Sequence, residues 1–195
     1  KYARKSKFTR DDAYELGYSY FSLKDYENAI NFLDQVARFD DSLGQIAMYQ
    51  IAESYLFSEK LLPARSAFES ASEMTAIEKI KEDALYNFAV ISFDIDINPY
   101  DESVRAFENY LERYPNSSRK KDVYQYLINV YSSTSNYKKA IESLNKLPNL
   151  DARLKRVYQT ISYNHGVELF LKRRFNSSIK AFADVSKHPI DPQLV

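Results

Sequence analysis

The chain has 195 residues but no cysteine, no tryptophan, only three glycines and only six prolines. Without cysteine there can be no disulfides, no thiolate catalysis and no cysteine-based metal site. Three glycines can hardly form a phosphate-binding loop, and neither a Gly-rich loop nor a Gly-x-Ser-x-Gly elbow occurs. Few glycines and prolines also leave little material for tight turns, whereas alanine, leucine, lysine and glutamate favour helices. The composition therefore predicts an all-α fold and argues against an enzyme.

Charge of neither sign is in excess, because 27 lysines and arginines balance 27 aspartates and glutamates. No overall field would attract a polyanion, so nucleic acid is not expected as a partner. Basic clusters occur at residues 119–121 and 172–174, and we interpret them as solvated helix ends, with a patch for an anionic lipid or partner as the alternative. No apolar run approaches the roughly 18 to 20 residues of a membrane span, so no direct span is expected.

Residues 12–37 form a pattern of two short amphipathic helices joined by a polar turn. The spacing of their apolar residues places one stripe on each helix, and Asp25 is the expected N-cap of the second. Such a hairpin cannot bury both of its apolar faces alone, so the pattern predicts further helices packed beside it. The two stripes consist of Ala13, Leu16, Gly17 and Tyr20, and of Tyr26, Ala29, Ile30, Leu33 and Val36.

The same pattern returns four more times, with a period in the mid-thirties. Self-similarity at this period is typical of stacked two-helix units, each in contact with its sequence neighbours. In the third unit the turn between the helices is longer, and Asn98-Pro99 should end one helix and start the next. We expect a single superhelical domain of residues 1–195, part of a longer array, with a frayed lead-in at residues 1–7. Its repeats are predicted at residues 9–42, 43–78, 79–117, 118–150 and 151–188.

Certain residue types recur at fixed positions of these units. They include an aromatic residue three positions after the small one at Tyr20 and Tyr55, and Ala-x-x-x-Phe or a near equivalent in each second helix. The small residues are Gly17, Ala52, Ala89 and Gly166. Together these recurring residues resemble those of the tetratricopeptide repeat. The resemblance implies a right-handed α-solenoid of about five helix-turn-helix repeats, working as a non-catalytic protein-protein interaction scaffold. Ile128 at a small-residue position and the absence of the family's tryptophan depart from the pattern.

A second resemblance lies between Phe107 and Ser118, where Tyr114-Pro115 closes one repeat before the next begins. It is similar to the Tyr-Pro-x-Ser repeats of bacterial cell-envelope scaffolds, such as outer-membrane assembly lipoproteins and the periplasmic coordinator of the tol-pal system. This implies an alternative function as a structural component of a cell-envelope or outer-membrane assembly complex, and slightly favours a periplasmic location over a cytoplasmic one. A proline that stops a helix explains the same residues locally. A helical-repeat binder of nucleic acid is the least favoured function.

In tetratricopeptide folds the first helix of each pair lines a concave groove, and the resemblance assigns a nearly continuous ladder of tyrosines to it. Tyrosine has a rigid apolar body and one polar tip, which suits the binding of a protein or peptide segment. The alternative interpretation is that these rings only fill the seam between helices. No groove position carries lysine or arginine, which disfavours a clamp for a terminal carboxylate. The candidate partner-binding residues are Tyr14, Tyr18, Tyr49, Glu53, Tyr86, Asn87, Gln125, Asn129 and Tyr163.

Candidates for catalysis or metal binding are few. His165 occupies the position of Leu16, Ile51 and Phe88 in other repeats and is expected to be packed and hydrogen-bonded in the core. His188 lies in a His-Pro loop with no Asp or Glu at helical ligand spacing, so neither histidine supports a zinc site. We therefore predict no catalytic residue, no metal and no cofactor.

The last predicted helix carries an apolar stripe of Ile179, Phe182 and Val185. Terminal repeats normally present a polar face to water. We expect further repeats to cover this stripe, with the tail after residue 187 or self-association through this face as alternatives.

Overall fold

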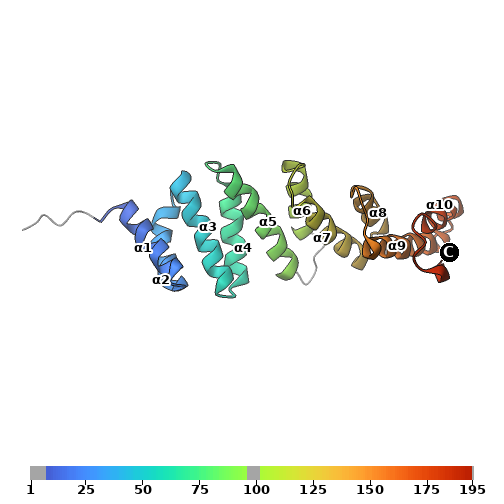
Figure 1. Ribbon diagram of the computed structural model, residues 1–195, viewed down its shortest axis with the longest axis horizontal. Coiled ribbons are helices and arrows are strands. Elements are labelled where there is room, and N and C mark those ends of the chain that lie inside the picture. Colours follow the sequence, from blue (N-terminus) through green and yellow to red (C-terminus); the bar gives the residue numbers. More distant parts are fainter. Residues whose placement is uncertain (1–7, 96–101, 195) are drawn as a thin grey trace, which may run out of the picture. The chain divides into compact units, whose positions relative to one another are not determined.

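The computed structural model describes residues 8–95 and 102–194, and the described residues contain ten α-helices, one 3-10 helix and no strand (Figure 1). The chain divides into two compact units, residues 1–113 and 114–195. The predicted all-α class of helix-turn-helix repeats is confirmed. The single domain of residues 1–195 stays a prediction, and the lead-in at residues 1–7 and the Asn98-Pro99 turn lie outside the described residues.

The first unit contains three antiparallel helix pairs. Each helix packs against the next along the chain, and α3 also contacts both α1 and α5, so the first helices of successive pairs are neighbours. The helices are α1 (Arg10–Ser22), α2 (Tyr26–Ala37), α3 (Ser42–Phe57), α4 (Leu61–Glu73), α5 (Glu78–Ile95) and α6 (Glu102–Arg113).

The second unit contains two more pairs and a short tail. Consecutive helices again pack on each other, and the tail contacts α9. None of the described helices in either unit is both long and apolar enough to cross a membrane. The elements are α7 (Lys120–Ser133), α8 (Tyr137–Asn145), α9 (Ala152–Leu171), α10 (Phe175–Val185) and η1 (Pro192–Leu194).

Small residues occupy the positions where paired helices cross. A Cβ atom built on Gly17 would lie 2.7 Å from Cγ of Leu33 on α2, and one on Gly166 would lie 2.6 Å from the Phe182 ring on α10. Ala52 and Ala89, at the same position in the next two repeats, are fully buried. A larger side chain at these positions would force the atoms of the paired helix to move, so these residues permit the close approach within each pair.

The turns between paired helices use left-handed backbone without glycine. Lys24, Glu59, Ser135 and Arg173 have φ between 57° and 61°, and they lie seven residues after Gly17, Ala52, Ile128 and Gly166, the equivalent positions of their repeats. The next helix starts two residues later in each case. In the first repeat, Asp25 caps it by accepting a hydrogen bond from the backbone N–H of Asn28 at 3.3 Å. The predicted cap at Asp25 is confirmed. This repeated conformation explains how a chain with three glycines makes its turns.

A buried glutamine fastens the segment that leaves the second helix in two of the repeats. Gln45 on α3 donates to the carbonyls of Ala71 and Met74, both at 3.1 Å, and its Oε1 accepts from the N–H of Ile77 at 2.6 Å. Gln159 on α9 donates to the carbonyl of Asp191 at 2.8 Å and accepts from the backbone N–H groups of residues 190 and 191. Both glutamines are fully buried. They hold equivalent linkers, which periodicity alone did not reveal.

The tail therefore follows α9 and leaves α10 open on one side. Ile179 and Phe175 on α10 are 66% and 52% exposed, whereas Val185 is buried. The prediction that the tail covers the stripe is wrong for Ile179. Coverage by further repeats and self-association through this face stay predictions.

An ion pair fastens the turn between α2 and α3 to the start of α1. Arg10 donates to both carboxylate oxygens of Asp41, at 2.5 and 2.6 Å, and its guanidinium lies 4.5 Å from the centre of the Phe39 ring. Asp41 also accepts the backbone N–H of Gly44 at 2.8 Å as the N-cap of α3. The hydrogen bond from Arg10, followed by that from Gly44, lowers the pKa of Asp41 from 3.8 to about 2.

Replacing Asp41 with Asn should remove a stabilisation of the fold that depends on pH. The folded-state pKa lies below the unfolded one, so the stabilisation is present above pH 3.8 and is lost as the pH falls towards about 2. Asn still caps a helix, so the variant removes mainly the charge. The melting temperatures of the two proteins should differ by a constant amount from neutral pH down to about 4 and converge near the folded-state pKa. A difference that persists unchanged in strong acid would contradict this explanation.

Candidate partner-binding face of the first helices

The predicted groove residues of the first unit lie on α1, α3 and α5, which are neighbours. On α1, the rings of Tyr14 and Tyr18 stack with centroids 6.2 Å apart and planes 17° from parallel. Tyr18 is 50% exposed and Tyr14 half-buried. This pair presents an ordered aromatic surface to solvent, because each ring restricts the other.

Tyr49 joins α3 to two of its neighbours. Its ring packs edge-on against Phe68 of α4, with centroids 5.5 Å apart, and its hydroxyl donates a hydrogen bond to the Asp83 carboxylate on α5. Asn87, one turn after Asp83, donates its side-chain amide to the carbonyl and carboxylate of Asp83, both at 2.9 Å. Asp83 thus links α3 to α5. We define the first-helix face of the first unit as Tyr14, Tyr18, Tyr49, Glu53, Asp83, Tyr86 and Asn87.

The other tyrosines of the ladder also pack against the second helices of their repeats. The Tyr86 ring lies 5.7 Å from that of Tyr110 on α6, and the Tyr163 ring lies 5.8 Å from that of Phe182 on α10. Packing between the paired helices therefore accounts for one side of the rings of Tyr49, Tyr86 and Tyr163. It does not account for Tyr18, whose ring contact is with Tyr14 of its own helix.

In the second unit the predicted residues lie on α7 and α9. Gln125 donates its side-chain amide to Oδ1 of Asn129, one turn later on α7, at 3.2 Å. Tyr163 on α9 is 38% exposed. None of these predicted residues carries a carboxylate, so the two units differ in the chemistry that their predicted residues offer.

The carboxylate of Glu53 on the first-helix face lacks a hydrogen-bonding or ionic partner among the described residues. It is half-buried, and the described residues offer it no hydrogen bond and no cation. Burial, together with the nearby charge of Asp83, raises its pKa. Gln50, one turn earlier on α3, is only 9% exposed, and its Oε1 is buried without a hydrogen-bond partner.

Asp83 is the functional candidate that the sequence prediction missed. It lies three residues before Tyr86, one helical turn away and on the same side of α5. A signal was present, because Asp11 and Asp122 precede Tyr14 and Gln125 by the same three residues. The role of Asp83 nevertheless depends on its contact with Tyr49 of another helix, which spacing within one repeat cannot predict.

His165 differs from its prediction. Its side chain is half-buried rather than in the core, and its ring packs edge-on against Tyr137 with centroids 6.4 Å apart. Nδ1 is buried and lies 3.6 Å from the Glu168 carboxylate, too far for a hydrogen bond. The apolar side chain of Leu127, at the equivalent position, is buried, whereas the polar imidazole of His165 keeps part of its surface exposed. Within residues 8–95 and 102–194, no three His, Asp or Glu side chains gather as a metal site.

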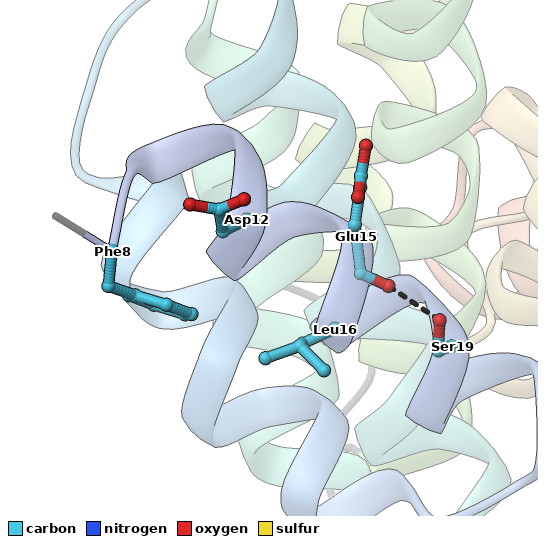
Figure 2. A pocket seen from close by; sticks show the side chains of 5 residues that line it. All are labelled: Phe8, Asp12, Glu15, Leu16 and Ser19. Carbon is cyan, nitrogen blue, oxygen red and sulfur yellow. Dashed lines mark hydrogen bonds between the residues drawn. The ribbon is translucent and has the colours of Figure 1, made fainter. Parts of the chain in front are cut away.

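A shallow hollow of about 440 Å³ lies on another side of α1 (Figure 2). Figure 2 shows its lining residues, Phe8, Asp12, Glu15, Leu16 and Ser19, all on α1 or just before it. Leu16 is 39% exposed, whereas Ile51 and Phe88 at the equivalent position are 5% and 8% exposed. The hollow therefore marks the side of α1 that a preceding second helix covers in the next repeats.

Helix pairs that stack with a small residue at each crossing define the class of helix-turn-helix repeat proteins. Residues 13–42 and 83–117 each match a family model described as tetratricopeptide repeat. The chain therefore contains tetratricopeptide repeats, as predicted, and these repeats place it among protein-protein interaction scaffolds, which are generally non-catalytic. No curated protein sequence matches the chain.

Solved structures show the same fold. A crystal structure of MamA protein is 18% identical, with a TM-score of 0.55, over 93% of this chain and 92% of that one. MamA 41-end from Desulfovibrio magneticus RS-1 is 17% identical, with a TM-score of 0.54, over 91% of this chain and 93% of that one. A crystal structure of nearly identical TPR-like repeats of a Podosopora anserina kinesin light chain is 11% identical, with a TM-score of 0.50, over 97% of this chain and 100% of that one. At these identities the likeness concerns the fold alone.

Proposed function

We propose that this chain is a non-catalytic scaffold that binds a peptide segment of a partner protein along the first-helix face of its first unit. The observation that carries the proposal is the stacked pair Tyr14 and Tyr18, since packing between helices does not account for the half-exposed ring of Tyr18. Large aromatic side chains held in one orientation lose little conformational entropy on binding, and tyrosine is enriched among residues that dominate interface energies.

The polar groups beside these rings support a role in fixing the register of a bound segment. Tyr49 and Asn87 both donate to Asp83, so the face is ordered before any partner arrives. Preorganised hydrogen-bonding groups raise affinity because they reduce the ordering cost of association. An extended or helical segment lying across α1, α3 and α5 would contact rings and polar groups in alternation.

The double variant Tyr14→Ala, Tyr18→Ala tests this proposal. A displayed library of random twelve-residue peptides is selected on the whole chain, and labelled copies of the enriched peptides are titrated by fluorescence anisotropy. Each buried tyrosine contact at a hot spot is worth about 1 to 2 kcal/mol, so we expect affinity to fall about tenfold or more.

Leu62→Ala provides the matched control, because Leu62 is 59% exposed but lies at the start of the second helix α4. This change should leave peptide affinity within about twofold, a difference of about 0.4 kcal/mol. If a folded double variant bound the same peptides as well as the unaltered chain, the proposal would be wrong.

The cell-envelope alternative remains a prediction from the sequence. Tyr114 and Pro115 directly follow α6, where the proline serves to end the helix. A lipid-attachment cysteine after a signal peptide in the full-length gene would favour an envelope role, and a cytoplasmic start would count against it.

A further inference from the structure

Hydrogen-bond acceptors collect on the first-helix face where α3 and α5 meet. Glu53 and Gln50 are three residues apart, which places them one turn apart on the same side of α3. Within the described part of the chain, Glu53 has no ion pair or hydrogen bond, and the Oε1 atom of Gln50 is buried with no partner. The Asp83 carboxylate lies close enough to Glu53 for its charge to act on it.

This arrangement is costly in the protein alone. A buried acceptor without a donor forfeits a hydrogen bond that water would supply, and two neighbouring carboxylates repel each other when both are charged. The raised pKa of Glu53 reflects both costs, burial first and the charge of Asp83 second. Groups that destabilise a fold in this way are concentrated at sites that serve binding or catalysis.

A cationic side chain is the group that would relieve these costs. Lysine brings three N–H donors and arginine five, with no acceptor to clash with the carboxylates. The rings of Tyr49 and Tyr18 lie on the same face, and aromatic rings attract cations. The charges around the ladder have the same sign, because Asp11 and Glu15 on α1 are also acidic and no ladder position carries lysine or arginine.

We propose that the segment bound by the first-helix face is a basic peptide, and that one of its lysine or arginine side chains donates to Glu53 and Gln50 beside Asp83. This inference rests on the proposed function, whose face it uses, and adds the chemistry of the partner. An acidic segment would be repelled by the carboxylates of Glu53 and Asp83. The partner segment is therefore expected to be recognised by positive charge and apolar contact together.

The variant Glu53→Gln tests the inference and should not damage the fold. The folded-state pKa of Glu53 lies above its unfolded value, so the folded protein prefers the protonated form. Its stability is therefore highest below the unfolded pKa and falls as the pH rises through the folded pKa. Gln mimics the protonated form, so Glu53→Gln should melt at the same or a higher temperature than the unaltered chain at pH 7, and the difference should vanish below pH about 4.

The binding experiment uses peptides selected on the whole chain from the random library, each paired with a copy whose lysines and arginines are replaced by methionine. We expect the selected peptides to be rich in lysine or arginine. Glu53→Gln should weaken their binding about tenfold while changing the affinity of the methionine copies less than about twofold, as expected for a charge-assisted contact. The control Glu69→Gln removes an exposed acid on α4 and should leave both affinities unchanged.

Each result separates the two proposals. Selected peptides without enrichment of basic residues, or equal affinity for Glu53→Gln, would overturn the inference while the proposed function stands. Equal weakening by Glu53→Gln and Glu69→Gln would reveal attraction by net charge only, which also overturns it. A library that yields no peptide dependent on Tyr14 and Tyr18 would overturn the proposed function, and this inference with it.

Discussion

Gly44→Ala should lower the free energy of unfolding by about 3 kcal/mol, the upper end of the usual cost of overpacking. Gly44 lies in the first turn of α3, and a Cβ atom built there would lie 1.9 Å from the carbonyl oxygen of Phe39. The obstacle is backbone rather than a flexible side chain. The segment cannot easily move away, because Arg10 holds it through Asp41 and stacks on the Phe39 ring. Urea denaturation followed by far-UV circular dichroism measures the loss.

Gly17→Ala is the matched comparison. There the nearest atoms to a new Cβ are Cγ and Cδ2 of Leu33, at 2.7 and 2.8 Å, and these belong to a side chain that can shift. The gain in helix propensity, about 1 kcal/mol, applies to both substitutions. We expect a loss of about 1 kcal/mol for Gly17→Ala, well below that for Gly44→Ala. Equal losses at the two glycines would contradict the distinction between backbone and side-chain obstacles.

Gln45→Leu should also destabilise the first unit by about 3 kcal/mol. Leucine fills a similar volume but leaves three backbone groups without their partner, namely the carbonyl of Ala71 near the end of α4, and the carbonyl of Met74 and the N–H of Ile77 in the linker to α5. Each unsatisfied buried group costs about 1 to 3 kcal/mol, and access of water to the linker limits the sum. The denaturation experiment described for Gly44 applies here too.

Gln35→Leu serves as the control for that change. Gln35 is exposed on α2, and its side-chain amide donates only to the carbonyl of Asn31 in its own helix. Its replacement should change stability by less than about 0.5 kcal/mol, as is usual for surface positions. If Gln45→Leu were equally harmless, the linker would not depend on the buried glutamine.

The repeat architecture could be predicted because stacking imposes a period that a single sequence displays. Gly17 and Gly166 recur at helix crossings, and the structure places each against the paired helix. Gly44 could not be recognised in this way, because glycine occurs at this position in one repeat only, and its role comes from the close approach of the preceding turn to α3. Gln45 and Gln159 were equally hidden, since they occur in two of five repeats and act on linkers about thirty residues later.

The candidate site could be predicted only in part, for a related reason. Helical spacing placed the tyrosines on one side of the first helices, but not the depth to which each ring packs against its second helix. The rings of Tyr49 and Tyr86 pack against rings on α4 and α6, whereas the ring of Tyr18 is half-exposed. The link from Tyr49 to Asp83 joins residues of different repeats, so it depends on how α3 and α5 meet.

The central claim is that a partner segment binds on α1, α3 and α5, and backbone amide shifts of the isotope-labelled chain test it most directly. On titration with a peptide selected from the library, the account predicts that the largest shifts occur around Tyr18, Glu53 and Asn87. Residues of the second helices, such as Leu62 on α4, should shift little. Shifts concentrated on the second helices, or on the hollow around Phe8 and Leu16, would contradict the account.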